Sequence, residues 1–361
     1  MKKLVIEKAK LVDNLNKLKS VTNSPIIATL KNNGYGLGLD EFPKLLMENG
    51  IDFFAVSTTE EAITLRNNGI NAKIMLLHST AIYDELLILL NNDILPTVGS
   101  FEALNTLDKI SKESGTSVYC QLKIDTGFGR FGFLPDDMIK LAGELKAKPN
   151  IGIIGVFSHF SSSFNEKTNY TDKQFNIFNK CVSILTDEGI DVGFRHIANS
   201  SAFLTKPYTH LDVSRIGSAL LGRILVPNSL ELNKIGYMVS EIEDMKKLPI
   251  NHYIGYSNTY KTARETTIGI VPVGYLDGLE LKKGQDCFGF IDTLREIYNK
   301  FKNFNKKIYV EVNNIKVPIL GKIGTNNIVI DLTDINAKIG DIVKLDVNPM
   351  MVRPDIERYF D

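Results

Sequence analysis

The chain has 361 residues, 43% of them hydrophobic, and its 42 basic residues balance 42 acidic ones. This length exceeds that of a usual single domain, so one large domain and a smaller one are expected. The balanced charge gives no electrostatic basis for binding nucleic acid or a membrane surface, and no segment approaches the roughly 20 apolar residues of a membrane span.

The cysteines and the N-terminal segment indicate a reducing compartment. Cys120, Cys181 and Cys287 are odd in number and form no close pair, which suggests neither a disulfide framework nor a cysteine-based zinc site. Residues 1–8 carry charges beyond a short apolar run and are not typical of a signal peptide. We therefore expect a cytoplasmic protein.

Short apolar runs alternate with helical patterns up to about residue 220. The predicted strands are Ile26–Lys31, Phe53–Ser57, Lys73–Leu77, Leu95–Val98, Val118–Ile124, Ile153–His159, Phe194–Ala198 and Leu211–Arg215. The predicted helices include Asp40–Asn49, Thr59–Asn67, Ala81–Asn91, Phe101–Glu113 and Thr171–Glu188. This alternation predicts an α/β fold of the (β/α)₈ TIM-barrel type. The seventh strand has the weakest pattern, and a smaller number of strands would favour a doubly wound sheet.

The remainder of the chain predicts a mostly β domain. The predicted strands are Thr267–Val273, Ile308–Val312, Lys316–Leu320, Asn327–Leu332 and Ile342–Leu345, with a tight hairpin turn at Asn313 and Asn314. Helical spacing within residues 286–306 predicts an inserted amphipathic helix. We expect a barrel over residues 9–228 and a β-rich domain over residues 229–361, with residues 1–8 adding a strand to the second domain.

Lys31 ends the first predicted strand, immediately before a glycine-rich turn. Strand alternation places Ile27, Thr29 and Lys31 on one face. A buried ammonium is costly to desolvate, and the cost falls when the amine is neutral or covalently used, as in Schiff-base lysines. The alternative is a strand-end lysine whose amine reaches water.

The strand ends together form a dense set of titratable and polar groups. In a barrel of this type the chemistry lies at the C-terminal ends of the strands. Those ends carry Lys31, Ser57, His78, Lys123, Asp125, His159, His196, Asn199 and Arg215. So many such groups at one end of a barrel favour an active site there.

Residues 121–132 form a second informative segment. Alternation directs Lys123 and Asp125 into the barrel, and Arg130 follows on a glycine-rich loop. One interpretation is an ion pair between Lys123 and Asp125 that closes the barrel mouth. The other is that Arg130 reaches an anionic oxygen. The segment alone does not decide between them.

Small hydroxyl and glycine residues follow the last two predicted barrel strands. Ser200, Gly217 and Ser218 suit the phosphate site often found at this place in barrels, although ordinary turns use the same residue types. Together with Lys31 they suggest a phosphate-bearing aldehyde as cofactor. In the β domain, Tyr256 and Tyr275 would each, taken alone, be core or turn residues.

Several separated segments, in order along nearly the whole chain, resemble the alanine racemase family. They are Lys31–Gly38, with Leu37 where histidine is usual, Lys123–Arg130, Ser158–Phe160, His196–Ser200, Arg215 with Gly217, Gly255–Tyr256 and Gly274–Gly278. The members are pyridoxal 5'-phosphate enzymes with a (β/α)₈ barrel and a C-terminal β domain.

The resemblance implies a role for each matched residue. Lys31 would bind the cofactor covalently and act as one acid/base group, and Tyr256 of the partner subunit would be the other. The implied cofactor-binding residues are Lys31, Tyr35, Arg130, His159, His196, Asn199, Ser200, Arg215, Gly217 and Ser218. Arg130, Thr325 and Tyr275 would contact the substrate, and Lys123 is a candidate for carbamylation. No metal is expected.

The implied activity is racemisation of an amino acid, L-alanine to D-alanine, by a homodimer that supplies a D-amino acid for cell-wall peptide. Two bases suit a reaction that removes a proton from one face of a carbon and returns one to the other. The chain departs from the family where Gly324–Asn326 replaces Cys-Met-Asp, and where Pro354 replaces a tyrosine, with Tyr359 the nearest tyrosine. A larger pocket, and hence racemisation of serine or a larger amino acid, is the alternative.

Three other functions are weighed against racemisation. A pyridoxal-phosphate decarboxylase on the same barrel would want an acidic residue where Arg215 stands. A non-catalytic pyridoxal-phosphate-binding barrel would lack the β domain that carries Tyr256. A metal-dependent hydrolase would use His78, His159 and His196, but no HxH or HExxH spacing supports it.

Overall fold

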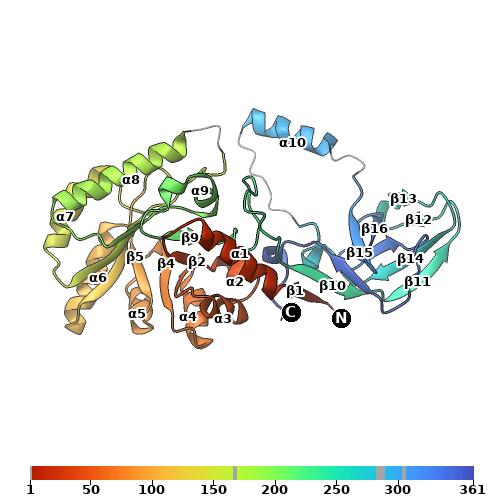
Figure 1. The fold of residues 1–361 in the computed structure, drawn as a ribbon, viewed down its shortest axis with the longest axis horizontal. Helices are drawn as coiled ribbons and strands as arrows, with labels where there is room; N and C mark the ends of the chain where they lie inside the picture. The colour runs from red at the N-terminus through yellow and green to blue at the C-terminus, as the bar shows by residue number, and fades with distance from the viewer. Residues whose placement is uncertain (1, 166–168, 282–288, 303–305) are drawn as a thin grey trace. The chain divides into compact units, whose positions relative to one another are not determined.

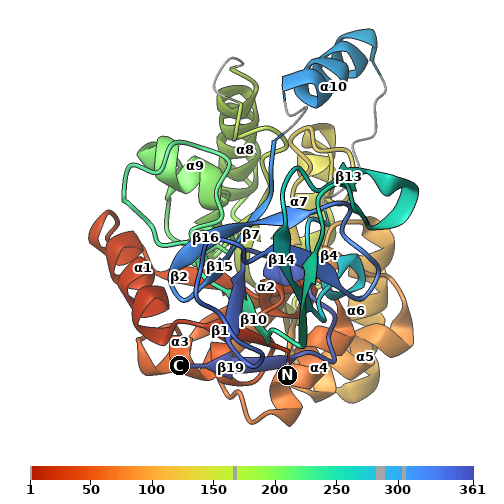
Figure 2. The ribbon, with the colours of Figure 1, turned by 90° about the vertical axis from the view of Figure 1, so that its right-hand side faces the viewer.

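The structure is a computed structural model that describes residues 2–165, 169–281, 289–302 and 306–361 (Figures 1 and 2). The chain divides into two compact units. One contains Lys8–Ile235, and the other contains Met1–Glu7 together with Gly236–Asp361. No helix in the described part of the chain is long and apolar enough to span a membrane.

The first unit is built on an eight-stranded parallel sheet with the order β8-β7-β6-β5-β4-β3-β2-β9. The strands are β2 (Ile26–Thr29), β3 (Phe53–Val56), β4 (Lys73–Ser79), β5 (Leu95–Val98), β6 (Val118–Lys123), β7 (Ile151–Phe157), β8 (Phe194–His196) and β9 (Ser214–Ile216). Between the two end strands, Arg215 N donates to Ala198 O at 3.2 Å, which nearly closes the barrel. All eight predicted strands are present, including the seventh, so the predicted barrel is confirmed.

Helices alternate with the strands along the chain, and most of them lie on the outside of the sheet (Figure 1). They are α1 (Lys8–Ser20), α2 (Lys31–Tyr35), α3 (Glu41–Glu48), α4 (Thr59–Asn67), α5 (Tyr83–Asn91), α6 (Phe101–Ser114), α7 (Met138–Lys146), α8 (Tyr170–Asp187) and α9 (Ser200–Thr205). Hydroxyl groups cap two of them, because the side chains of Thr58 and Ser100 accept backbone N–H groups of α4 and α6. Of these helices, α1, α2, α7 and α9 are not among those named from the sequence.

The barrel interior is filled by apolar side chains from alternate positions on several strands. This core cluster consists of Ile27, Phe53, Ala55, Met75, Phe157 and Val213. Alternate residues of a barrel strand point inward, which explains why Phe53 and Ala55 both belong to it. The cluster separates the two ends of the barrel and supports the polar groups at the carboxyl ends of the strands.

The second unit contains a nine-stranded sheet with the order β11-β14-β17-β16-β15-β18-β10-β1-β19. The strands are β1 (Lys3–Ile6), β10 (Tyr237–Glu241), β11 (Asp244–Leu248), β14 (Thr266–Val271), β15 (Tyr309–Val312), β16 (Ile315–Leu320), β17 (Ile328–Asp331), β18 (Ile342–Leu345) and β19 (Glu357–Phe360). A separate hairpin pairs β12 (Tyr253–Ile254) with β13 (Tyr260–Lys261). The predicted mostly β domain is thus confirmed.

Local features of this unit follow from its sequence. Asn313 and Asn314 have φ values of 50° and 63°, so they form the predicted hairpin turn between β15 and β16. Strand β1 pairs antiparallel with β10 and parallel with β19. The inserted helix α10 spans Phe290–Lys302. Part of the predicted segment 286–306 lies outside the described residues.

One prediction about Lys31 is wrong in detail. Strand β2 ends at Thr29, so Lys31 does not continue the strand. From Asn32 to Tyr35 the backbone is left-handed, with φ between 54° and 61°. Asparagine and glycine tolerate this conformation, whereas a tyrosine adopts it only when its surroundings hold it there. This left-handed turn directs the chain away from β2 immediately after Lys31.

Candidate active site

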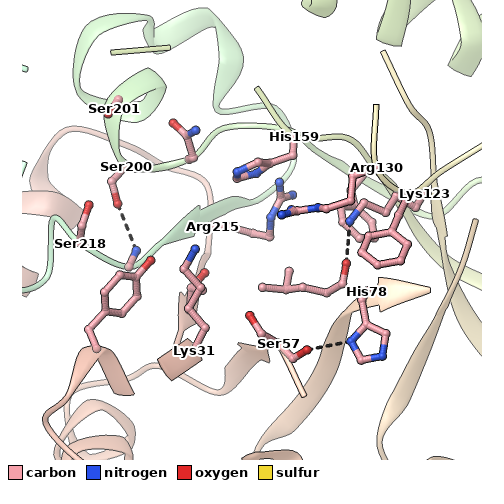
Figure 3. A pocket seen from close by; sticks show the side chains of 17 residues that line it. Lys31, Ser57, His78, Lys123, Arg130, His159, Ser200, Ser201, Arg215 and Ser218 are labelled. Carbon is pink, nitrogen blue, oxygen red and sulfur yellow. Dashed lines mark hydrogen bonds between the residues drawn. The ribbon is translucent and has the colours of Figure 1, made fainter. Parts of the chain in front are cut away.

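A cavity of about 440 Å³ lies at the carboxyl ends of the barrel strands (Figure 3). Its lining residues are Thr29, Lys31, Tyr35, Ser57, Leu77, His78, Lys123, Arg130, Phe131, Phe157, His159, Asn199, Ser200, Ser201, Arg215, Gly217 and Ser218. None of these lining residues is acidic, and four are lysine or arginine. The cavity is therefore suited to anionic groups.

Lys31 is the first residue of α2, and its side chain extends into this cavity. Its amine lies 5.8 Å from the centre of the Tyr35 ring, and its charge lowers the pKa of His159. Figure 3 shows its side chain directed into the space bounded by Ser200, Arg215 and His159. The amine is therefore positioned to meet a ligand rather than bulk solvent.

One side of the cavity forms a cradle of hydrogen-bonding groups. Ser200 Oγ accepts the N–H groups of Gly217 at 3.1 Å and Ala219 at 3.2 Å, so its own proton can be donated into the cavity. A Cβ atom on Gly217 would lie 2.4 Å from Tyr35 Oη, so glycine is needed for the tyrosine to approach. Burial raises the pKa of Tyr35 to about 12, which keeps its hydroxyl protonated as a donor.

Asn199 lines the cavity but is already engaged within the protein. Its Oδ1 accepts Ala202 N at 3.1 Å, as the N-cap of α9, and Ser163 Oγ at 2.8 Å. It therefore fixes the start of the helix whose first residue is Ser200.

Arg215 is the most deeply buried cation of the site. Its guanidinium donates to Ser158 O at 2.6 Å, to His196 O at 3.1 Å and to His196 Nδ1 at 2.6 Å. Burial lowers its pKa to about 9, which leaves the charge intact at neutral pH. His196, predicted to bind the cofactor, is not among the lining residues, and it contacts Arg215 instead.

Lys123 is 5% exposed, and its amine donates to Leu77 O at 2.6 Å. Burial, and after it the charges of Arg215 and Arg130, lower the pKa of Lys123 to about 7. A substantial fraction of this amine is therefore neutral at physiological pH, and a neutral amine is a nucleophile.

Asp125 supports the loop that carries Arg130. Its two carboxylate oxygens accept the backbone N–H groups of Gly127, Phe128, Gly129 and Arg130. No ion pair joins Lys123 to Asp125 within the described residues, so the ion-pair interpretation of this segment is wrong. The Arg130 guanidinium stacks 4.5 Å from the centre of the Phe128 ring.

His159 faces these cations. Burial, followed by the charges of Arg215, Lys123, Lys31 and Arg130, lowers its pKa well below the usual value. The imidazole is therefore neutral at physiological pH, and it can accept a hydrogen bond as well as donate one.

Three predicted site residues belong to the second unit. Tyr256 is 76% exposed and follows Gly255, whose φ of 76° suits glycine. Thr325 Oγ1 lies 3.3 Å from Tyr275 Oη, and Tyr275 N donates to Gly324 O. None of the three is among the residues that line the barrel cavity.

Buried Asp277 anchors this tyrosine loop. Its carboxylate accepts Gly274 N at 2.9 Å and pairs with the amine of Lys2 at 2.9 Å. The N-terminal strand region therefore holds the loop that presents Tyr275.

Sequence reasoning did not assign several lining residues. Thr29, Leu77, Phe131, Phe157 and Ser201 were not predicted as site residues, and Ser57 and His78 were noted only as strand ends. Strand alternation placed Thr29 on the same face as Ile27 and Lys31, and this pattern could have identified Thr29 as a lining residue. His78 Nδ1 lies 2.7 Å from Ser57 O and its Nε2 lies 3.4 Å from Glu85. The described residues contain no group of three potential metal ligands.

Comparison with known proteins identifies relatives over most of the chain. Residues 6–224 match the model of the alanine racemase N-terminal domain, and residues 236–353 match that of its C-terminal domain. The alanine racemase of Clostridium tetani is 35% identical over 350 residues, covering 94% of this chain and 84% of its own. That of Methanococcus maripaludis is 32% identical over 348 residues, covering 94% and 87%.

Solved structures agree with these sequence matches. The alanine racemase of Clostridium difficile 630 superimposes with a TM-score of 0.86 at 26% identity, covering all of this chain and 95% of its own. The alanine racemase of Streptomyces lavendulae, a D-cycloserine producer, has a TM-score of 0.85 at 25% identity, covering 100% and 97%.

The carboxylate of Asp125 generates a pH-dependent prediction. Burial alone would raise its pKa, but the backbone N–H groups of Gly127, Gly129, Phe128 and Arg130 outweigh burial and lower it. The stabilisation is present above the unfolded pKa of about 4 and is lost as the pH falls through the lower folded value. We expect Asp125→Ala to lower the free energy of unfolding by about 2–3 kcal/mol at neutral pH.

Urea unfolding of wild type and Asp125→Asn between acidic and neutral pH measures this effect. The isosteric amide lacks the charge, so the difference between the two proteins should be constant near neutrality and shrink below about pH 4. A difference that does not change with pH would contradict the role given to the carboxylate.

Proposed function

Because the chain belongs to the alanine racemase family, we propose that it interconverts L- and D-alanine with pyridoxal 5'-phosphate bound in the barrel cavity. The observation that carries this proposal is that Lys31, Arg215 and the donor cradle around Ser200 line one cavity without carboxylates. An amine, a set of phosphate donors and a fixed cation are the groups that this cofactor requires.

The residues of the cavity fit the cofactor by their chemistry. Lys31 would hold the aldehyde carbon through its amine. The hydroxyls of Tyr35 and Ser200 and the N–H groups near Gly217 and Ser218 would hold the phosphate. Arg215 would contact the ring nitrogen, and Arg130 the phenolic oxygen and the substrate carboxylate. When bound, pyridoxal phosphate supplies an electron sink that makes the α-proton of an attached amino acid removable.

Racemisation then requires one proton-transfer group on each face of the substrate. Lys31 serves one face, and we assign the other to Tyr256 of the partner subunit. A phenol has a reference pKa near 10, so it needs a polar partner to act as a base. His159, which burial and the surrounding cations keep unprotonated, is suited to exchange a hydrogen bond with that phenol.

Because Arg215 keeps its proton at neutral pH, it would donate a hydrogen bond to the ring nitrogen of the cofactor and would not protonate it. A weaker electron sink favours rapid return of the proton to carbon, which is what a racemase needs. This argues against the decarboxylase alternative.

We expect Tyr256→Phe to keep cofactor binding but to lower alanine racemisation by about 10²–10⁴-fold, because one proton-transfer group is lost. Visible absorbance measures cofactor binding, and chiral chromatography measures turnover of L-alanine, D-alanine and L-serine. The matched control is Tyr253→Phe, an exposed tyrosine of the same hairpin. Wild-type turnover in Tyr256→Phe would contradict the assignment, and serine turnover exceeding that of alanine would favour the larger-substrate alternative.

A homodimer with shared sites follows from placing Tyr256 of the partner subunit at each cavity. Mixing inactive Lys31→Ala with Tyr256→Phe should restore activity, because one site of each mixed dimer then contains both native groups.

We further propose a cytoplasmic enzyme whose D-alanine product enters cell-wall peptide.

We propose that Lys123 is carbamylated and in that form orients Arg130. Its neutral amine would attack carbon dioxide, forming an N–C bond and releasing one proton. Burial, and after it the charges of Arg215 and Arg130, disfavours the ammonium form of Lys123. A carbamate at this position would be an anion and would attract both arginines.

Carbon-13 NMR with labelled bicarbonate tests the modification. We expect a carbamate resonance that grows as the pH rises through about 7, where the amine loses its proton, and that is absent in Lys123→Met. Lys31→Ala should retain the resonance, which serves as the control for the second amine of the cavity. No resonance in the wild type at any pH would contradict carbamylation.

A further inference from the structure

A buried chain of side chains links three strands behind the cavity. Gln121 of β6 is fully buried, and its Oε1 lies 3.1 Å from His196 Nε2 on β8. The other ring nitrogen, Nδ1, lies 2.6 Å from Nη1 of Arg215 on β9. Nothing in the proposed reaction uses Gln121, although it is two contacts away from the cavity.

The direction of each hydrogen bond follows from the chemistry of the groups. Arginine can only donate, so His196 Nδ1 must be an acceptor. Burial and the charges of Arg215 and Lys123 hold the pKa of His196 well below its usual value, so the ring is neutral and has a single N–H. That proton must therefore be on Nε2, where Gln121 Oε1 is the acceptor. The opposite amide orientation would place two donors face to face.

The buried position of the Gln121 amide lowers the stability of the fold. Gln121 Nε2 is buried and has no hydrogen-bond partner, which destabilises the fold relative to an apolar side chain of similar shape. A Cβ atom on Gly155 would lie 2.7 Å from Gln121 Oε1, so glycine leaves the space that the amide occupies. The His196 ring also stacks on Phe157, with ring centres 4.9 Å apart and an interplanar angle of 17°.

We propose that Gln121 is a positioning residue that keeps the proton of His196 on Nε2 and thereby holds the Arg215 guanidinium in its place at the cavity. The other tautomer would put a proton on Nδ1, 2.6 Å from a guanidinium nitrogen, and would displace it. Only the expected effect on turnover depends on the proposed function, because the tautomer is a property of the protein itself.

Nitrogen-15 NMR of histidine-labelled, cofactor-loaded protein reads the tautomer directly, with His196 assigned by the loss of its signals in His196→Asn. Wild type is expected to show the proton on Nε2. Gln121→Met keeps the shape of the side chain but leaves the Nε2 proton buried without an acceptor. We therefore expect the Nδ1 tautomer, with Arg215 displaced from Nδ1, to become populated in this variant. Gln121→Glu restores an acceptor and should restore the Nε2 proton.

Turnover provides the second measurement. Gln121→Met should lower kcat by about tenfold with little change in KM, because Arg215 acts after substrate binding. Phe178→Leu, a change at a buried residue of α8, controls for a general loss of stability. If Gln121→Met does not fold, Gln121→Asn removes the acceptor by shortening the side chain.

The two proposals fail in distinguishable ways. A tautomer population in Gln121→Met and Gln121→Asn that is the same as in the wild type would overturn the role of Gln121, whatever the turnover. If the tautomer changes in the Gln121 variants but neither they nor the wild type racemise alanine, the result would support the role of Gln121 and contradict the proposed function.

Discussion

The structure depends on the concentration of positive charge at one end of the barrel. Lys31, Lys123, Arg130 and Arg215 all line one cavity, and no lining residue carries a compensating carboxylate. Burial, and after it the repulsion between these like charges, lowers the pKa of Lys123 to about 7 and holds the pKa of His159 well below its usual value, so that its ring is neutral. An anionic ligand would relieve this repulsion, and the proposed cofactor and substrate are both anionic.

Backbone carbonyl groups, rather than carboxylates, stabilise the buried cations of the cavity. The guanidinium of Arg215 is held by the carbonyl oxygens of Ser158 and His196, and the amine of Lys123 by that of Leu77. Carbonyl groups at strand ends are fixed by the barrel, so they orient the cations before any ligand arrives. The carboxylate of Asp125 is directed at backbone N–H groups, so it shapes the Arg130 loop without neutralising the cavity.

The sequence was most informative where periodicity reports burial. Alternating strands and helices predicted the barrel, and residues at the strand ends predicted Lys31, Lys123 and Arg215 as neighbours in space. The end of β2 was missed because a left-handed turn at Asn32 and Asn33 has no periodic signal. The hydrogen bond between Gln121 and His196 joins residues 75 positions apart, and side-chain packing alone determines it. The hydrogen bonds of Asp125 to its own loop depend on the backbone geometry of that loop, which strand alternation does not predict.

The covalent role of Lys31 is the central claim, and reduction with borohydride tests it most directly. The cofactor-loaded protein is reduced, digested and analysed by mass spectrometry to locate the phosphopyridoxyl group. One modified residue, Lys31, is the predicted result. A label on Lys123, whose amine has the lowered pKa, or no label on any lysine, would contradict the account.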